Sequence, residues 1–162
     1  MPRLRDDQCY QIVKAVDVGP ILSAWDRLPF FSINHNLDGS DPNKPPCDVV
    51  LQDKYPPEIR EFIVGLALGG RLGRSVIRRL DPGRGIPAHT DAWMPGELNW
   101  RRFQVPLVTH PDIVMCWRDY AVTVHLEVGK LYEVRFDRTH EVINPTASYR
   151  THLQIDQIDA TI

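Results

Sequence analysis

The pair of residues best suited to chemistry lies in the segment "PAHTDAW", residues 87–93, where His89 and Asp91 are two positions apart. The turn-forming segment "RLDPGRG" comes just before it, so a strand is expected to begin there and to carry both residues. Side chains two apart on a strand point to the same face. An imidazole and a carboxylate on one face can bind one metal ion together, so this spacing predicts part of a metal site.

A third ligand is expected from His140, at the start of a short predicted strand in "RTHEVINP". Two neutral imidazoles and one carboxylate on one face of a metal, with the other positions open, are typical of non-haem Fe(II) oxygenases. The open positions allow a co-substrate to chelate the iron and O2 to take the remaining place. We therefore expect His89, Asp91 and His140 to bind Fe(II).

Arg150 comes ten positions after His140, on the last predicted strand. A guanidinium group offers a rigid set of donors that pairs with a carboxylate through two hydrogen bonds. A cation inside a barrel costs free energy unless an anion meets it. Arg150 is therefore expected to bind the far carboxylate of a dicarboxylic co-substrate, and the alternative is a surface salt bridge with Asp156 or Glu141.

The bulk composition is that of a globular domain: 162 residues, 43% of them hydrophobic and 25% charged. A formal net charge of −2 disfavours a general attraction to nucleic acid or to anionic membranes. The sequence has no apolar run of membrane-spanning length and no signal-peptide pattern at its start, so a cytoplasmic protein is expected. Cys9, Cys47 and Cys116 are isolated, which predicts reduced thiols.

The residues up to 70 predict two helices, 17–28 and 56–70, with a loop over 38–48 between them. From residue 71 onward, short β-rich runs alternate with turn residues, as in a closed sandwich or barrel. The predicted fold is mainly β, a double-stranded β-helix (jelly roll, cupin-like) with N-terminal helices packed on one sheet. Residues 1–162 are expected to form one domain, with 1–70 as a helical preface and loop and 71–162 as the jelly-roll core.

From about Arg78 to Asp156 the chain resembles the aspartyl/asparaginyl β-hydroxylase family of 2-oxoglutarate- and Fe(II)-dependent dioxygenases. The resemblance is carried by "PGRGIPAHTD", "RRFQVPLVT", "GKLYEV" and, most specifically, "HEVINPTASYRTHLQID". It implies an enzyme that uses Fe(II), 2-oxoglutarate and O2 and releases succinate and CO2. The implied reaction is hydroxylation of an aspartyl, asparaginyl or related amino-acid side chain, either free or in a peptide.

The resemblance also implies roles for individual residues. It gives the same three iron ligands, and it matches Arg150 to the arginine that holds the far carboxylate of 2-oxoglutarate. Arg102 matches an arginine near the co-substrate, and Gln104 stands where the vertebrate-type enzymes carry a histidine, at the iron-proximal carboxylate. Strand alternation agrees, because it places Arg102 and Gln104 on one face and Phe103 and Val105 on the other.

Candidate substrate contacts surround these positions. Residues 71–102 contain seven arginines against three acidic residues, which suits an entrance that attracts anions and a substrate that bears a carboxylate. The segments 34–48 and 92–100 are expected to form a lid. The candidates are Trp93, at least one of Arg78, Arg79 and Arg84, and His152, which should point the same way as Arg150.

Two other functions fit the same residues. A non-catalytic cupin-like module would use the barrel to hold a metal or a small acid, but it has no need for open coordination positions. A nucleic-acid demethylase of the same superfamily would also use the His89–Asp91 pair with a distant histidine. The near-neutral charge and the lack of a basic, aromatic-rich groove disfavour that partner. The expected partner is a small molecule or a peptide.

Overall fold

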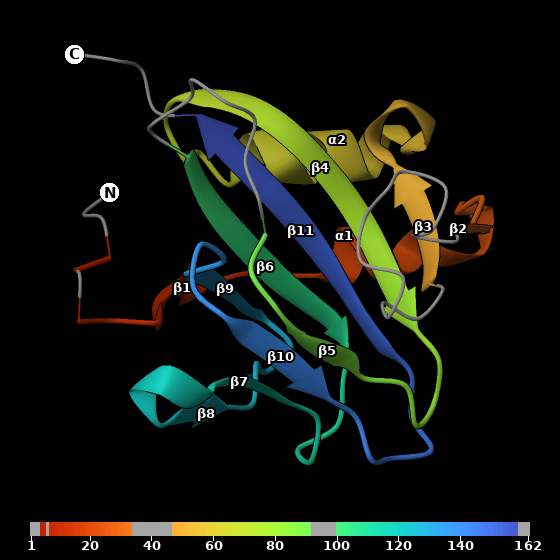
Figure 1. Cartoon of the computed structure of the whole chain (residues 1–162). Helices are drawn as coiled ribbons and strands as arrows, with labels where there is room; N and C mark the ends of the chain where they lie inside the picture. The colour runs from red at the N-terminus through yellow and green to blue at the C-terminus, as the bar shows by residue number, and fades with distance from the viewer. Residues whose placement is uncertain (1–3, 6, 34–46, 92–99, 159–162) are drawn as a thin grey trace.

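The computed structural model describes residues 4–5, 7–33, 47–91 and 100–158, which form two antiparallel β-sheets and two short helices (Figure 1). The large sheet has the strand order β1-β9-β6-β11-β4-β3-β2, and the small sheet has the order β5-β10-β7-β8. In that order, the large sheet contains Tyr10–Ala15, Lys130–Val134, Trp100–Val108, Arg150–Ile158, Arg71–Leu80, Cys47–Leu51 and Phe31–Ile33. The small sheet contains Ile86–His89, His140–Ile143, Val114–Trp117 and Val122–Val124.

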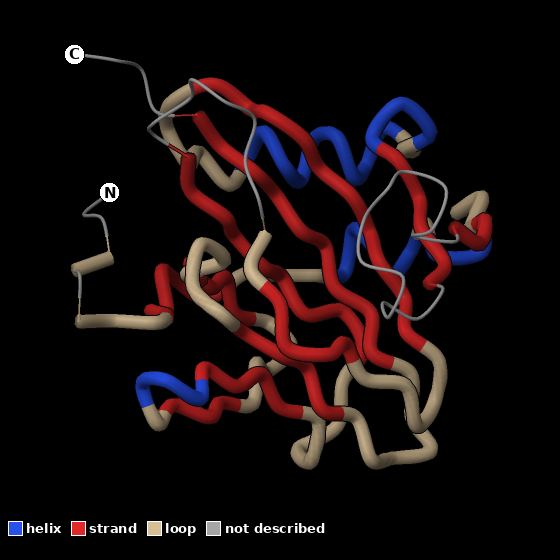
Figure 2. The backbone as a smooth tube through the Cα atoms, viewed as in Figure 1, coloured by secondary structure: helices blue, strands red, loops and turns tan. Residues whose placement is uncertain are grey.

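The two helices, α1 (Gly19–Ser23) and α2 (Pro57–Gly65), lie behind the large sheet, while the small sheet lies in front of it (Figures 1 and 2). Apolar side chains of both helices join the outer-facing residues of β4, β6 and β11 in the largest core cluster. The predicted double-stranded β-helix with helices packed on one sheet is therefore confirmed.

The central strands β6 and β11 are buried over almost their whole length, but their two faces differ in chemistry. Phe103, Val105, Leu153 and Ile155 pack in the helix-covered core. The alternate residues point toward the small sheet and are mostly polar, because side chains on a strand alternate between faces. A row of buried polar groups therefore faces the small sheet, and we call this side the inner face of the large sheet.

The N-terminal part departs from the expected helical preface. Residues 1–70 contribute three strands, β1, β2 and β3, to the large sheet as well as two helices. The expected helix over 17–28 is reduced to α1 and a short 3-10 turn at Trp25–Arg27. The helix expected over 56–70 ends at Gly65, because Ala67, Gly69 and Gly70 adopt positive φ angles that a helix excludes. Most of the loop expected at 38–48 lies outside the described residues.

The three cysteines, Cys9, Cys47 and Cys116, are buried free thiols, as the sequence predicts. Across the described ranges, every helix is too short or too polar to cross a lipid bilayer.

Candidate metal centre

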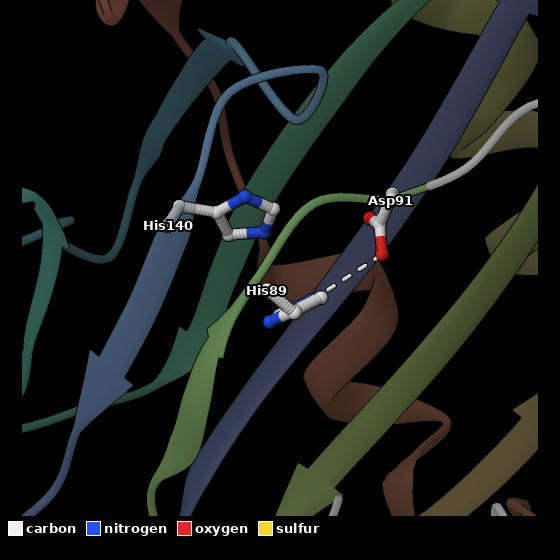
Figure 3. A group of neighbouring side chains, drawn as sticks. All are labelled: His89, Asp91 and His140. Carbon is white, nitrogen blue, oxygen red and sulfur yellow. Dashed lines mark ion pairs between the residues drawn. The ribbon is translucent and has the colours of Figure 1, made fainter. Parts of the chain in front are cut away.

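The expected metal ligands are brought together at one end of the small sheet (Figure 3). His89 is the last residue of β5, Asp91 follows two positions later, and His140 is the first residue of β10. The antiparallel pairing of β5 and β10 sets His140 directly opposite His89, with their ring centroids 4.4 Å apart. One potential ligand atom from each of the three residues lies within 4.8 Å of the other two.

Both imidazoles are oriented by the backbone. His89 Nδ1 lies 2.8 Å from the carbonyl oxygen of Pro87, and His140 Nδ1 lies 2.8 Å from that of Arg138. A carbonyl oxygen only accepts, so Nδ1 donates in each ring and Nε2 is left as the nitrogen that can bind a metal. This is the usual outer support of a metal-binding histidine, because it fixes both the tautomer and the direction of the ring.

The two oxygens of Asp91 have different neighbours. Oδ1 lies 3.3 Å from His89 Nε2, on the side of the histidine pair, whereas Oδ2 accepts a hydrogen bond from Arg102 Nη1. Burial opposes ionisation of this carboxyl, but the hydrogen bond with His89 and the charge of Arg102 outweigh it and hold the pKa well below its usual range. Asp91 is therefore an ionised carboxylate with one oxygen on the side of the two imidazoles.

His140 is kept neutral mainly by burial, which lowers its pKa to about 4. A neutral imidazole is the form that binds a metal ion. Two imidazole Nε2 atoms and one carboxylate oxygen fit a divalent first-row metal such as Fe(II) and leave room in its coordination sphere for other ligands.

Arg102 links the metal centre to the large sheet. It lies on β6 opposite Asp156 of β11, and its Nε and Nη2 donate to the two carboxylate oxygens of Asp156 at 2.6 and 3.1 Å. Because Arg102 also binds Asp91, its guanidinium bridges two carboxylates and orients the candidate metal ligand. Sequence reasoning placed Arg102 near the co-substrate, but it did not identify Asp156 as its partner. The sequence did contain one signal for this pair: Asp156 stands an even number of positions after Arg150 on the same predicted strand, so the two side chains share a face.

Arg150 lies on the inner face of β11, with only 6% of its surface exposed. Among the described residues its side chain makes no hydrogen bond and no ion pair, and burial followed by repulsion from Arg78 lowers its pKa to about 10. The two surface partners considered from the sequence are engaged elsewhere. Asp156 binds Arg102, and Glu141 binds Arg118. The orientation of Arg150 therefore leaves a buried positive charge between the sheets.

Gln104 and His152 form a pair on the same inner face. His152 Nδ1 lies 2.9 Å from Gln104 Oε1, so the ring donates to the amide oxygen. Burial, and then the charge of Arg150, hold the pKa of His152 well below its usual value, which makes the ring neutral. Its Nε2 is buried without a hydrogen-bond partner in the described part of the chain.

The three other candidate arginines lie in different surroundings. Arg78, on β4, is paired with His152 of β11 and therefore shares its inner face. Arg79 points the opposite way, donates to Asp48 at 3.2 Å through Nε, and lies over the ring of Phe30 at 4.4 Å. Arg84 is exposed in the turn before β5. Trp93 lies outside the described residues, as do residues 34–46 and 92–99, which make up most of the lid segments expected at 34–48 and 92–100.

Comparison with solved structures shows the same fold in several proteins at low sequence identity. An oxidoreductase of the 2OG-Fe(II) oxygenase family from Burkholderia pseudomallei has a TM-score of 0.66 and 16% identity, covering 91% of this chain and 84% of that one. HygX from Streptomyces hygroscopicus, solved with nickel and 2-oxoglutarate bound, has a TM-score of 0.65 and 12% identity, covering 97% and 85%. A prolyl-4-hydroxylase from Pseudomonas putida has a TM-score of 0.62 and 12% identity, covering 94% and 93%.

No protein-family model matches the sequence, and no curated protein matches it either. At these identities the likeness establishes the double-stranded β-helix fold and not the activity.

Proposed function

We propose that this protein is a 2-oxoglutarate- and Fe(II)-dependent oxygenase that hydroxylates an amino-acid side chain and releases succinate and CO2. His89, Asp91 and His140 would bind Fe(II), and Arg150 would bind the far carboxylate of 2-oxoglutarate. The observation that carries the proposal is the combination of a His-Asp-His group with a buried, unpaired arginine between the same two sheets.

A metal-binding module without catalysis would not need Arg150. Burying a cation without a partner costs several kcal/mol, roughly, so a chain that keeps one is expected to pair it with a ligand. A dicarboxylic 2-oxo acid fits both ends of this arrangement, because its oxo acid end can chelate the metal while its other carboxylate meets the guanidinium. The three solved structures described above share the fold in which this arrangement would operate, and HygX was solved with 2-oxoglutarate.

The bound iron would supply the oxidation chemistry, namely the activation of O2 coupled to decarboxylation of the 2-oxo acid. The protein's residues supply orientation. The carbonyl oxygens of Pro87 and Arg138 direct the two histidines, and Arg102 holds the outer oxygen of Asp91 so that the inner one faces the metal. Arg102 would act as a positioning residue for the iron ligand. Gln104, which pairs with Gln154 of β11, would lie between the metal and Arg150 along the inner face.

For the substrate, we propose an aspartyl, asparaginyl or related amino-acid unit, free or in a peptide. The support is the sequence resemblance over "PGRGIPAHTD" and "HEVINPTASYRTHLQID" and the excess of arginines along residues 71–102. Trp93 and Arg84 remain proposed contacts near the entrance, because both stand within five positions of His89. The proposed substrate is a small molecule or a peptide rather than a nucleic acid.

The test is turnover of 2-oxoglutarate by the purified chain with Fe(II) and ascorbate. Free amino acids and peptides that contain Asp or Asn are added in turn, and succinate is measured together with the mass of each candidate substrate. The expected result is the gain of one oxygen atom by one of them in proportion to succinate. If only a nucleobase is oxidised, the substrate proposal is wrong. If no condition yields succinate and 2-oxoglutarate does not bind, the oxygenase proposal is wrong.

A further inference from the structure

We propose that Arg78 is a second binding residue for the far carboxylate of the co-substrate, so that this carboxylate is held between two guanidinium groups, those of Arg78 and Arg150. The inference rests on the proposed function, because it concerns the same site. It adds a residue that neither the metal centre nor the single-arginine arrangement requires.

The position of Arg78 follows from strand pairing. On β4 it pairs with His152, and the next inward position on the same strand, Leu80, pairs with Arg150. Leu80 and Val76, two positions to either side of Arg78, pack against Ile113 and Val142, the latter on β10 of the small sheet. Because residues two apart share a face, Arg78 also points between the sheets, diagonally beside Arg150.

The same pairing orders the inner face from the metal outward. Arg102, which touches the metal ligand Asp91, pairs with Asp156 of β11. His152 stands four residues back along β11 and Arg150 six residues back. Arg78 therefore stands one inward position nearer the metal than Arg150. A short dicarboxylic acid that extends from the metal toward Arg150 reaches the level of Arg78 first.

The charges of this region point the same way. Arg102 is neutralised, because it binds both Asp91 and Asp156. The side chains of Arg78 and Arg150 make no hydrogen bond and no ion pair within the described ranges, and Arg78 Nε is buried without a partner. Burial lowers the pKa of Arg78 below its ordinary value, and its positive charge in turn disfavours the charge on Arg150. Two neighbouring cations that repel each other are stabilised together by one anion placed between them.

One carboxylate has enough acceptor capacity for this task. Its two oxygens offer about four lone-pair sites, which can accept a two-bond contact from one guanidinium and a further bond from another. Two guanidiniums on one carboxylate also select strongly for a dicarboxylic acid over a 2-oxo acid that lacks the far carboxylate, because the second acid would leave two buried cations unpaired.

The matched variants come from a single strand. Arg78→Met removes the inner guanidinium and keeps much of its volume. Arg79→Met removes the adjacent one, which faces away and pairs with Asp48. Arg78→Lys keeps a charge but loses the fork of donors. Binding of 2-oxoglutarate and of 2-oxobutanoate is measured by calorimetry on the Mn(II)-loaded protein, with the melting temperature of each variant recorded without ligand.

We expect Arg78→Met to weaken 2-oxoglutarate binding at least tenfold, to change 2-oxobutanoate binding less than threefold, and to leave Mn(II) binding as in the wild type. Arg78→Lys should fall between, and Arg79→Met should bind 2-oxoglutarate within threefold of the wild type. Without ligand, Arg78→Met should melt at the same temperature as the wild type or higher, because an unpaired charge has been removed, whereas Arg79→Met should melt lower.

Unchanged 2-oxoglutarate binding in a folded Arg78→Met protein overturns the inference. If that variant keeps its affinity for 2-oxoglutarate but loses coupled oxidation of a primary substrate, Arg78 serves that substrate, and the inference is again wrong. Failure of the proposed function is recognised separately, because the wild-type protein would then not bind 2-oxoglutarate at all.

Discussion

On β11, Leu153 and Ile155 point toward the helices and pack among apolar side chains, whereas Arg150, His152 and Asp156 point toward the small sheet. Both sets are buried to a similar degree, since each of these five residues exposes 6% of its surface or less. The outer set has its partners within the fold, because apolar contact is complete once the helices are in place. The inner set finds partners only in part, because Arg150 has none among the described side chains. This difference supports the proposal that the inner face binds ligands while the outer face stabilises the fold.

The inner face itself divides into paired and unpaired groups. Asp156 is paired with Arg102, and His152 is paired with Gln104. Arg150 and Arg78 have no such partner in the described part of the chain. Substitutions in these groups should therefore have different consequences. Loss of a metal ligand should abolish metal binding, and loss of an unpaired arginine should weaken co-substrate binding. Loss of an apolar or a paired polar side chain should lower stability.

The largest effect is expected at the metal centre. His140→Ala should abolish metal-dependent 2-oxoglutarate turnover, because the substitution removes one of two imidazole ligands and the remaining pair is a poor chelate. Fe(II) or Mn(II) binding followed by calorimetry, together with succinate release, measures this. His110→Ala, in the turn before β7, is the matched control and should keep both. Wild-type metal affinity in the His140→Ala protein would show that the metal binds elsewhere.

Removal of the unpaired charge should weaken ligand binding without weakening the fold. Arg150→Met is expected to cost about 2–5 kcal/mol of 2-oxoglutarate binding, a loss of tens-fold or more, because a buried charge-assisted pair is lost. Metal affinity should be kept, and the melting temperature without ligand should not fall. Arg150→Lys should restore only part of the affinity. Equal affinity for 2-oxoglutarate in wild type and Arg150→Met would contradict the assignment.

Sequence periodicity predicted the two faces before any register was known. Alternation along "RRFQVPL" separates Arg102 and Gln104 from Phe103 and Val105, and the structure places these pairs on opposite faces. It could also separate Arg78 from Arg79, but it could not say which of them faces inward. The inward residue is decided by which face of β4 the small sheet covers. The structure shows this through the contacts of Leu80 and Val76 with Val142 of the small sheet, which the sequence alone does not give.

Long-range pairing accounts for what the sequence could not provide. The bridge of Arg102 to Asp91 and Asp156 depends on the register of β6 against β11 and on the entry of β5, which are set by residues far apart in the chain. The three N-terminal strands are only three to six residues long, too short for a clear alternation. They are recognisable as strands only beside their partners, which are β9 for β1, β4 for β3 and β3 for β2. The metal ligands were easier to predict, because His89 and Asp91 are close in sequence.

The outer face should respond in the opposite sense to Arg150. Ile155→Ala deletes a fully buried side chain from the helix-covered core and should lower the free energy of unfolding by about 2–5 kcal/mol. Urea denaturation monitored by circular dichroism measures the loss. Metal and 2-oxoglutarate affinities per folded molecule should remain as in the wild type, because no ligand-facing group has changed. A large loss of co-substrate affinity at temperatures where the variant is folded would show that the two faces are not independent.

The smallest effect tests whether paired groups on the inner face are structural. Gln104→Leu removes the acceptor of His152 Nδ1 and leaves a buried N–H group unpaired, which should cost about 1–3 kcal/mol of stability. The double variant Gln104→Leu/His152→Leu removes both members of the pair and should be more stable than the single variant, since no buried polar group is then left without a partner. Denaturant unfolding of the wild type, both single variants and the double variant gives the coupling energy directly.

If the two losses of stability simply add, the 2.9 Å contact between His152 and Gln104 contributes nothing to the fold. Gln104 would then belong with Arg150 among the groups kept for a ligand, and its substitution should weaken 2-oxoglutarate binding instead.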